Sequence, residues 1–528
     1  MSETPHTAEI LAAAPSFLCG DEVLTRVYRM RWGSFARNVV RTERGWVVTE
    51  FHQPGPGRAH GTVNAAAGHH ILEGRWLRRP DVIDDYVRFW FTAPEAEPHR
   101  YTEWIAWASR EHLRLHGGRD AAGELLPGMI ATFEAWDADS LHPSGLYWAH
   151  DLADAMEFSI SGDGFRPTIN SYQYGNADAI AELAQRSGRD DVVERFSSAR
   201  DELHAKVLEH LYDPELELFA TLPLSDDGED AYLATADAER RMPPEYRRMP
   251  LPRREEQPRA RRARELVGFT PWYVGLPGPE LDASRAVAQL TDPDGFAGPH
   301  GLRTAERRHP RYGFAVSTTL PRFLCRWNGP SWPFATSQTL TALARIARAG
   351  RTPAADSAFL TLLRQYAASH LEPDGGYWLD EDLDPDTGAW LARDWRRRND
   401  PARAEIGRDY QHSTFADLVL SGLLGIDVDD RAITVRPLPS AAELGWFEVH
   451  GLRLGGLDVG LSWHPEHGMR LAAGARVARR PELGDLRIPI SPNDIPTTDL
   501  GRGADQSDPE SPAEPTRLRS NAHQEEMT

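Results

Sequence analysis

The chain has 528 residues, of which 59 are Lys or Arg and 79 are Asp or Glu, so its formal net charge is −20. A surface of this charge repels phosphate backbones, and we therefore expect no nucleic-acid partner. Hydrophobic residues make up 40% of the chain, yet no apolar run reaches the roughly 18 residues of a membrane-spanning helix. The composition predicts a globular protein without a membrane partner.

The cysteine content and the N-terminal residues indicate a compartment. The chain has two cysteines, Cys19 and Cys325, which are too few for a disulfide framework. The N-terminal residues lack the basic stretch and the long apolar core of a secretory signal. We therefore expect a cytoplasmic protein.

Residues 1–95 mix extended-looking segments, such as 44–51, with aromatic clusters, and we expect them to lead into a helical barrel. Helical periodicity dominates residues 96–430. Gly188 is expected to end one of these helices. Apolar residues at spacings of three and four predict two pairs of neighbouring helices, namely 176–188 with 190–214 and 337–350 with 354–371.

Repeated helix–turn–helix units can stack as a bundle, an open solenoid or a closed toroid. No sequence repeat of fixed period is visible, which weakens the solenoid. Long, motif-rich loops between the helices favour a toroid whose loops build a site on one face. We therefore expect a mainly α protein built as a toroid.

Three other stretches differ from the helical region in composition. Residues 222–264 are polar and charged, and we expect a solvated insertion, with a mobile lid as the alternative. Residues 431–483 alternate apolar and polar side chains and predict a small β-rich C-terminal region. Residues 484–528 are rich in Pro, Asp, Ser and Glu and are expected to be disordered.

Four segments concentrate polar and aromatic residues in a way that a core helix does not. The first, 61–77, contains His69, His70, Glu73 and Trp76. Histidine and glutamate can ligate a metal, but adjacent histidines point to different faces of a helix. We therefore expect a structural or substrate-positioning role and no bound metal.

The second segment, 147–162, carries Asp154 and Glu157 and is followed at once by 165–175. In a helix these two acids face the same way, and two close carboxylates raise the pKa of one of them, which suits a general acid. Spacing alone leaves open a purely structural role, in which the acids cap a helix and pair with Arg166.

The third segment, 325–338, surrounds two proline turns with Trp327, Asn328, Trp332 and Gln338. The Gly-Pro pair forces a tight turn, and the second proline suits the first turn of a helix. A rigid loop that presents two indoles and an amide fits recognition of a sugar ring. A buried aromatic corner between helices is the alternative.

The fourth group, 375–390 with 405–418, is rich in acids. A calcium loop is an alternative for 375–390, but its glycine comes late and the Glu that closes an EF-hand is missing at the required offset. We expect no metal and no cofactor. The candidate carboxylates are Asp380, Glu381, Asp382, Asp384, Asp386, Glu405 and Asp409.

Together these motifs resemble those of the mannosylglycerate-hydrolase-like glycosidases, which are related to glycoside hydrolase family 63 and more distantly to trehalases. Residues 327–333 match a W-x-G-P-x-W-P loop. Residues 379–390 resemble a segment E-x-Y-x-P-x-T-G, with Leu383 in place of the usual tyrosine. Residues 153–159 resemble the segment that carries the general acid, with Ala155 in place of a glycine.

The resemblance, which covers about residues 60–465, implies an (α/α)6 toroid, also called a six-hairpin barrel, and inverting hydrolysis by two carboxylic acids. Glu157 stands at the general-acid position and Glu381 at the general-base position, while Asp154 and Glu405 are reserve candidates. Substrate-binding roles are expected, by resemblance and chemistry, for Trp76, Trp148, Arg166, Asn170, Tyr172, Trp327, Asn328, Trp332, Gln338 and His412.

The resemblance therefore predicts a glycoside hydrolase whose partner is a small α-linked glucosyl- or mannosyl-containing saccharide or glycoside. Two alternatives stay open. Epimerases and polysaccharide lyases also use α/α toroids, and the His and Tyr residues that they need are present at His69, His70, His300, Tyr410 and His412. The two departures from the family motifs leave room for a non-catalytic sugar-binding protein.

Overall fold

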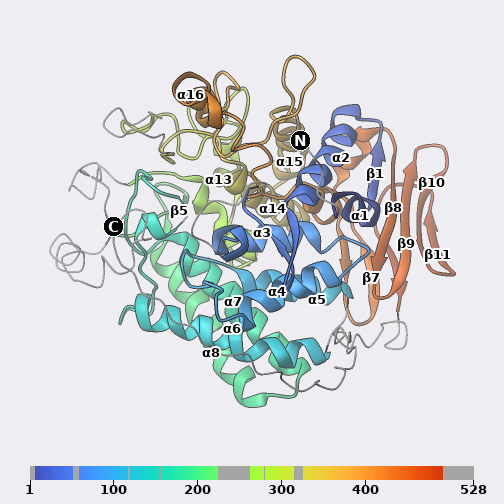
Figure 1. Cartoon of the computed structure of the whole chain (residues 1–528), viewed down its shortest axis with the longest axis horizontal. Helices are drawn as coiled ribbons and strands as arrows, with labels where there is room; N and C mark the ends of the chain where they lie inside the picture. The colour runs from blue at the N-terminus through green and yellow to red at the C-terminus, as the bar shows by residue number, and fades with distance from the viewer. Residues whose placement is uncertain are drawn as a thin grey trace, which may run out of the picture.

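The computed structural model describes residues 6–51, 59–116, 119–154, 156–223, 262–278, 280–313 and 325–490. Helices form the main body, and most strands come from the C-terminal part of the sequence (Figure 1). No helix within these ranges is long and apolar enough to cross a bilayer. Ala155 and most of the predicted insertion at 222–264 lie outside the described residues.

The helical body begins near the N-terminus and continues to residue 423. A π-helical segment, η5, spans Leu418–Leu423. The described α-helices are α1 (Thr7–Ala13), α2 (Glu22–Asn38), α3 (Asn64–Gly74), α4 (Asp81–Thr92), α5 (Ile105–His116), α6 (Arg119–Ser140), α7 (Pro167–Arg186), α8 (Asp190–His210), α12 (Thr270–Val274), α13 (Ser284–Thr291), α14 (Pro333–Ala349), α15 (Ala354–Ala368) and α16 (Leu391–Asn399).

The two helix pairs predicted from periodicity are confirmed, since α7 packs against α8 and α14 against α15. Gly188 follows the end of α7 with φ 71°, and Gly350 follows the end of α14 with φ 73°. Glycine adopts this left-handed conformation without a steric penalty, so the chain can leave each helix and turn back at once.

α3 lies at the centre of the helical body. Every residue from Asn64 to Gly74 is buried, and α3 packs against α5, which in turn packs against α7. A helix that is enclosed on all sides must satisfy its polar side chains within the protein. This requirement explains why His70 and Glu73 bond to other parts of the chain, as described below.

The strands form antiparallel sheets and hairpins. The largest sheet has the order β1 (Ser16–Cys19), β8 (Phe447–Leu454), β9 (Leu457–His464), β10 (Gly468–Ala473) and β11 (Arg476–Arg480). A three-stranded sheet has the order β12 (Leu486–Pro489), β7 (Ala432–Val435) and β6 (Ile426–Val428). The hairpins are β2 (Val39–Thr42) with β3 (Gly45–Val48) and β4 (Tyr212–Asp213) with β5 (Leu218–Phe219).

The predicted β-rich region after residue 430 is confirmed, with two differences at its borders. β1 comes from the N-terminal part of the chain and places Phe17 opposite Val449. The predicted disorder from residue 484 onward is wrong for residues 486–489, because they form β12 and pair with β7. Leu486 and Ile488 alternate with exposed residues and are buried.

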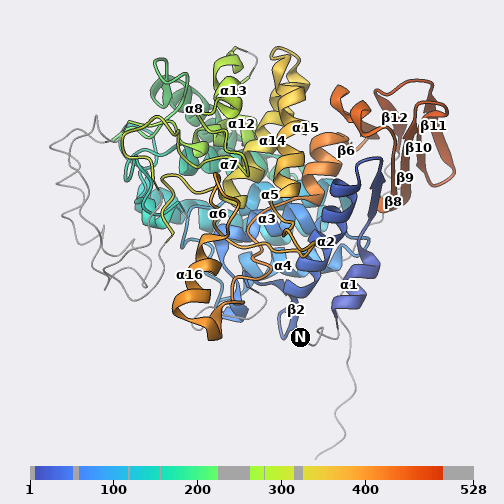
Figure 2. The same ribbon diagram turned by 90° about the horizontal axis from the view of Figure 1, so that it is seen from above.

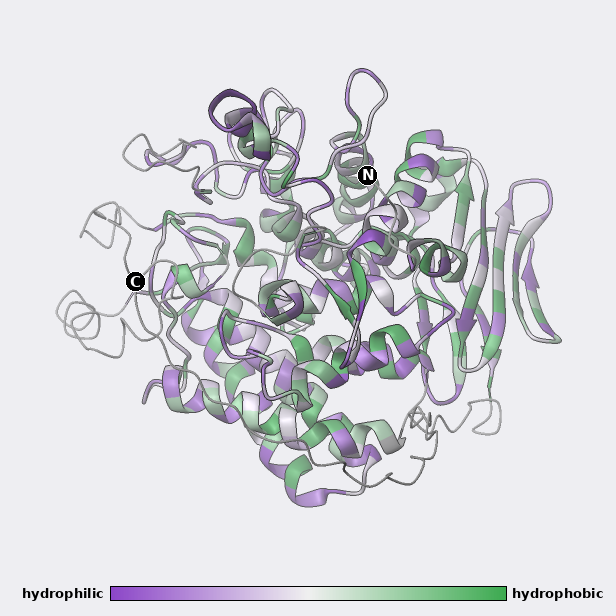
Figure 3. Ribbon diagram, viewed as in Figure 1, coloured by the Kyte–Doolittle hydropathy of each residue, from purple (hydrophilic) through white to green (hydrophobic). Residues whose placement is uncertain are grey.

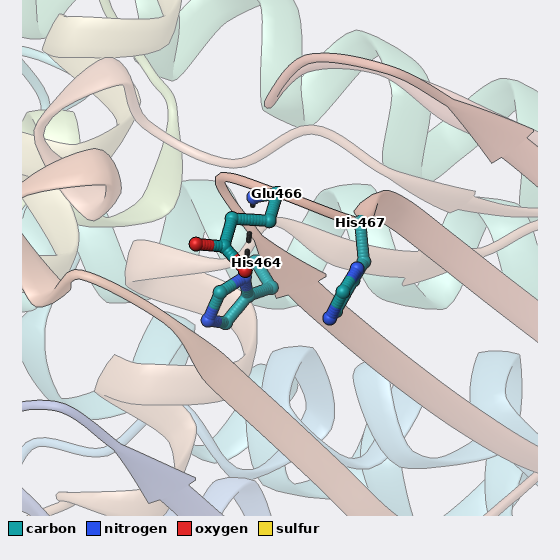
Figure 4. A group of neighbouring side chains, drawn as sticks. All are labelled: His464, Glu466 and His467. Atoms are coloured by element: carbon teal, nitrogen blue, oxygen red, sulfur yellow. Dashed lines mark hydrogen bonds between the residues drawn. The ribbon is translucent and has the colours of Figure 1, made fainter.

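The sheet lies at one side of the helical body, and α16 lies away from it (Figure 2). Hydrophobic and hydrophilic bands alternate along its strands, as expected when one face packs on a core (Figure 3). The β9–β10 turn carries His464, Glu466 and His467 (Figure 4). Nδ1 of His464 accepts a hydrogen bond from the backbone N–H of Glu466 at 3.1 Å, so the histidine stabilises the turn.

Candidate active site

Residues 325–332 hold together two loops that are far apart in the sequence. Ser331 and Leu383 form an antiparallel bridge with N–O distances of 2.8 and 2.9 Å. The backbone N–H of Trp327 donates to the carbonyl oxygen of Glu157 at 3.2 Å. This segment, which contains the predicted Gly-Pro and Trp-Pro turns, therefore fixes the loop of Glu157 and the loop of Leu383 on either side of itself.

The side chains of the same segment contact both predicted catalytic carboxyl groups. Trp327 Nε1–H donates to Oε2 of Glu157 at 3.0 Å, and the Cys325 thiol donates to Oε2 of Glu381 at 3.1 Å. Cys325 and Trp327 are two positions apart, which limits their Cα separation to about 7 Å. Both carboxyl groups also act electrostatically on the Cys325 thiol and the Tyr410 hydroxyl. The structure thus brings Glu157 and Glu381 together around one region.

The carboxyl group of Glu381 has a donor for each oxygen. Tyr410 donates its hydroxyl to Oε1 at 3.0 Å, opposite the thiol at Oε2. Burial raises the pKa of Glu381 above its usual range, although His412 and the Cys325 thiol act to lower it. Burial and the carboxylates of Glu381 and Glu50 raise the pKa of Tyr410 well above its ordinary value, so the phenol stays protonated and donates.

The two acids beside Glu381 in the sequence have other hydrogen-bond partners. Asp380 and Asp382 are buried, whereas Glu381 is half-buried, as expected where side chains alternate along an extended segment. Asp380 accepts from Trp378 Nε1 at 3.3 Å, and Asp382 accepts from the backbone N–H of Ala392 at 3.2 Å. These two acids therefore stabilise the loop, and among the three only Glu381 accepts a hydrogen bond from the Cys325 thiol within the described part of the chain.

His412 lies beside Tyr410 and an acid that sequence reasoning missed. Its ring stacks on Tyr410 with centroids 4.0 Å apart, and Nε2 lies 3.1 Å from Oε1 of Glu50. Glu50 follows β3 and stands in no motif, so no local signal could have found it. In the sequence, Tyr410 could be identified only as part of a polar loop and as a residue that an epimerase or lyase would need.

Two residues next to the candidate side chains have a left-handed backbone. Phe158, which follows Glu157, has φ 56°, and Asp409, which precedes Tyr410, has φ 62°. Arg37 holds the Asp409 carboxylate through two hydrogen bonds of 2.7 Å. Non-glycine residues in this conformation are uncommon and gather where the surroundings force a particular side-chain position.

The aromatic residues of the segment form a stack. Trp327 lies on Trp332 with ring centroids 4.3 Å apart, and Trp332 lies on Phe334 at 4.2 Å. All three side chains are buried. This arrangement is the buried aromatic corner that the sequence analysis gave as the alternative. Trp327 contacts Glu157 through its indole N–H.

Both reserve catalytic candidates have structural partners. Asp154 and Arg166 form an ion pair with no exposed side-chain surface, and the hydroxyls of Thr102 and Thr168 each donate to Asp154 at 2.6 Å. Glu405 is more than half exposed and pairs with two arginines at 3.2 and 3.7 Å. Neither residue contacts Cys325, Trp327 or Tyr410 through a hydrogen bond within the described part of the chain.

Several predicted substrate-binding residues are packed inside the protein. Trp76 Nε1–H donates to Asp417 at 2.8 Å, and Asn170 donates to the carbonyl of Tyr147 at 2.9 Å. Trp148 is fully buried, and Tyr172 and Gln338 bond to each other at 2.9–3.1 Å. Asn328 is half-buried and donates to the carbonyl of Arg311 at 3.4 Å. Contact of these side chains with a substrate stays a prediction.

Two polar residues of α3, His70 and Glu73, have hydrogen-bond partners in other parts of the chain, whereas the ring nitrogens of buried His69 have none among the described residues. Nδ1 of His70 lies 2.9 Å from the Tyr86 hydroxyl. The Glu73 carboxylate accepts from the backbone N–H groups of Phe415, Ala416 and Asp417 at 2.9–3.1 Å. Glu73 therefore fixes the start of η5, a structural role of the kind that we expected for this cluster.

Comparisons with known proteins agree with the predicted resemblance. Residues 59–413 match the family model of the mannosylglycerate hydrolase MGH1-like glycoside hydrolase domain. No curated protein matches the chain. A solved structure described as a sialidase is similar with a TM-score of 0.78 and 28% identity, and the match covers 91% of this chain and 42% of that one.

Two further structures share the fold at lower identity. A GH78 family rhamnosidase of a Bacillus species matches with a TM-score of 0.54 and 12% identity, over 87% of this chain and 42% of that one. A GH63 mannosylglycerate hydrolase from Thermus thermophilus in complex with glucose matches with a TM-score of 0.51 and 12% identity, over 74% and 98%. The chain spans less than half the length of the sialidase and rhamnosidase chains. Because the family model covers more than half of the sequence, the chain belongs to the mannosylglycerate hydrolase MGH1-like glycoside hydrolase family.

Proposed function

We propose that the chain is a glycosidase that cleaves an α-linked glucosyl- or mannosyl-containing saccharide or glycoside with inversion, on an (α/α)6 toroid. Glu157 is the general acid and Glu381 the general base. One observation carries the proposal: Cys325 and Trp327, two positions apart, bond to Glu381 and Glu157 respectively. The shared fold of the GH63 mannosylglycerate hydrolase supports the toroid.

In this mechanism protonated Glu157 donates to the glycosidic oxygen as the bond breaks. Glu381, ionised, takes a proton from a water that attacks the opposite face of the sugar, which requires about 6.5–9.5 Å between the carboxyl groups. The thiol and phenol donors fix the orientation of the Glu381 carboxylate. The raised pKa of Glu381 makes it a stronger base at neutral pH.

The test is a panel of α-glucosides and α-mannosides, with glucosylglycerate, mannosylglycerate, trehalose, an α-rhamnoside and a sialoside, and with the product anomer followed by proton NMR. Glu157→Gln and Glu381→Gln should each lower kcat/KM by about 10²–10⁴. Glu405→Gln, an exposed glutamate in a following loop, should keep the activity. Retention of configuration, or full activity in either of the first two variants, would contradict the proposal.

A second mechanism is favoured by one contact. Sialidases use a Tyr nucleophile, and Tyr410 is hydrogen-bonded to Glu381 at 3.0 Å in a chain with a sialidase-like fold. In this case Glu381 would take the phenol proton and Tyr410 would attack the anomeric carbon while Glu157 protonates the departing glycosidic oxygen. Water would then release the sugar from Tyr410, with net retention. The raised pKa of Tyr410 favours the donor role instead. Retention of the anomer together with complete loss of activity in Tyr410→Phe would support the nucleophile.

A further inference from the structure

A pocket of about 200 Å³, separate from the candidate active site, lies where the C-terminal ends of α3, α5 and α14 meet η5 and β6. Five arginines and three carboxylates line it, an excess of two positive charges in a chain whose net charge is −20. Among the described residues, the carboxyl groups of Glu157 and Glu381 accept hydrogen bonds from Trp327, Cys325 and Tyr410, which lie outside this lining. The arginines are Arg75, Arg114, Arg345, Arg348 and Arg436.

The carboxylates of the pocket are already paired. Glu111 contacts three arginines at 2.9–3.5 Å, two of which are Arg75 and Arg114. Asp417 pairs with Arg75 at 2.7 Å, and Asp427 lies 4.0 Å from Arg436. Since every carboxylate of the lining has an arginine partner, the two positive charges in excess must come from the remaining arginines.

Arg345 and Arg348 are those remaining arginines. Neither has a carboxylate within ion-pair distance among the residues that the structure describes. Arg345 is exposed, and its guanidinium lies 5.6 Å from the ring centre of Trp107. Arg348 donates from Nη2 to the carbonyl of Gly422 and from Nε to that of Arg436, and these two hydrogen bonds do not neutralise its charge.

The electrostatics of Arg348 favour the binding of an anion. Burial and the neighbouring Arg436 and Arg345 lower the pKa of Arg348 to about 10, although Asp427 acts against this. The group stays charged at neutral pH, and the charges of the arginines repel one another across the pocket. A bound anion would offset this repulsion.

We propose that this pocket binds a small phosphate dianion, as inorganic phosphate or as the phosphate group of an ester, with Arg345 and Arg348 as the principal ligands. The guanidinium fork presents parallel N–H donors that match two oxygens of a phosphate. The excess of two positive charges equals the charge of the dianion. The volume leaves room for phosphate and a small ester group. The site is independent of the proposed hydrolysis.

The test is isothermal titration calorimetry of the full chain with inorganic phosphate at pH 8 and low ionic strength, where phosphate is a dianion and screening is weak. Saturable binding at one site per chain is expected. Arg345→Ala and Arg348→Ala should each raise Kd at least about tenfold, because each removes a charge-assisted contact. Arg285→Ala is the control, since Arg285 is 75% exposed and outside the pocket.

Titration with glycerol phosphate separates the two sources of the ligand, since tighter binding than inorganic phosphate indicates an ester. Three results would overturn the site: no binding of phosphate at millimolar concentration, unchanged Kd in the Arg345 variant, or tighter binding of malonate than of either phosphate. Because the Arg345 side chain is exposed, its replacement tests the site even if the Arg348 variant unfolds, and the melting temperature of each variant shows whether it is folded.

Discussion

Tyr410 donates its hydroxyl to Oε1 of Glu381 at 3.0 Å. A donor to a carboxylate stabilises the ionised form, so its removal raises the pKa of the acid. In Tyr410→Phe, we expect the acidic limb of the kcat/KM profile to move to higher pH, because Glu381 must be ionised to act as the base. We also expect kcat to fall about tenfold or more. Tyr28→Phe, a change at another buried tyrosine, is the matched control. An acidic limb that does not shift in Tyr410→Phe would show that Tyr410 does not act on Glu381.

The thiol of Cys325 is the second donor to Glu381, at 3.1 Å. Burial and the negative charges of Asp382 and Glu381 raise the pKa of Cys325 well above its ordinary value, so the thiol keeps its proton. Cys325→Ser keeps a donor and should retain most of kcat/KM. Cys325→Ala removes the donor and should move the acidic limb upward in the same sense as Tyr410→Phe. Equal behaviour of the two variants would show that Cys325 only fills space.

The buried ion pair of Asp154 and Arg166 allows a test of whether Asp154 has a structural or a catalytic role. Arg166→Met leaves the Asp154 charge in the interior with only hydroxyl donors, and loss of one partner of a buried pair costs about 3–5 kcal/mol. We expect a clear fall in the melting temperature, measured by circular dichroism, for Arg166→Met and for Asp154→Asn. A variant Asp154→Asn that melts like the parent but has lost its turnover would instead make Asp154 a catalytic acid.

Local patterns in the sequence were enough for the helix pairs, whereas Glu157 and Glu381 became the candidate acid and base through the resemblance of their segments to family motifs. The periodicity of 176–214 and 337–371 reflects burial of one helix face, which is a local property. Glu157 and Glu381 stand in motifs with specific spacing. The contact of Tyr410 with Glu381 is different, because it depends on how two loops meet in space, and no spacing rule encodes that.

Composition does not decide between the two purposes that tryptophan can serve. Tryptophan provides both sugar-binding platforms and core volume, and Trp76 and Trp148 are almost completely buried. β12 has only two inward apolar side chains, Leu486 and Ile488, beside a polar C-terminal stretch. Its pairing with β7 stabilises it, and this pairing is not visible in the composition of the strand itself.

Glu103 gives the protein a predictable dependence of stability on pH. It is 2% exposed and accepts from the side chain of Asn176 at 3.2 Å. Burial raises its pKa from 4.5 to about 7. The folded state therefore binds this proton more tightly than the unfolded state does. The stabilisation is complete below about pH 4.5, falls as pH rises to about 7 and is then constant.

Glu103→Gln removes this titration, so the decrease in melting temperature between pH 5 and pH 8 should become smaller than in the parent. The difference corresponds to a free energy of unfolding on the order of 3 kcal/mol at most. Differential scanning calorimetry at a series of pH values measures it. Glu209→Gln, an exposed glutamate on α8, is the control and should leave the slope unchanged. If Glu103→Gln has the same slope as the parent, Glu103 is ionised in the folded protein at pH 5, and its backbone and amide donors outweigh the cost of burial.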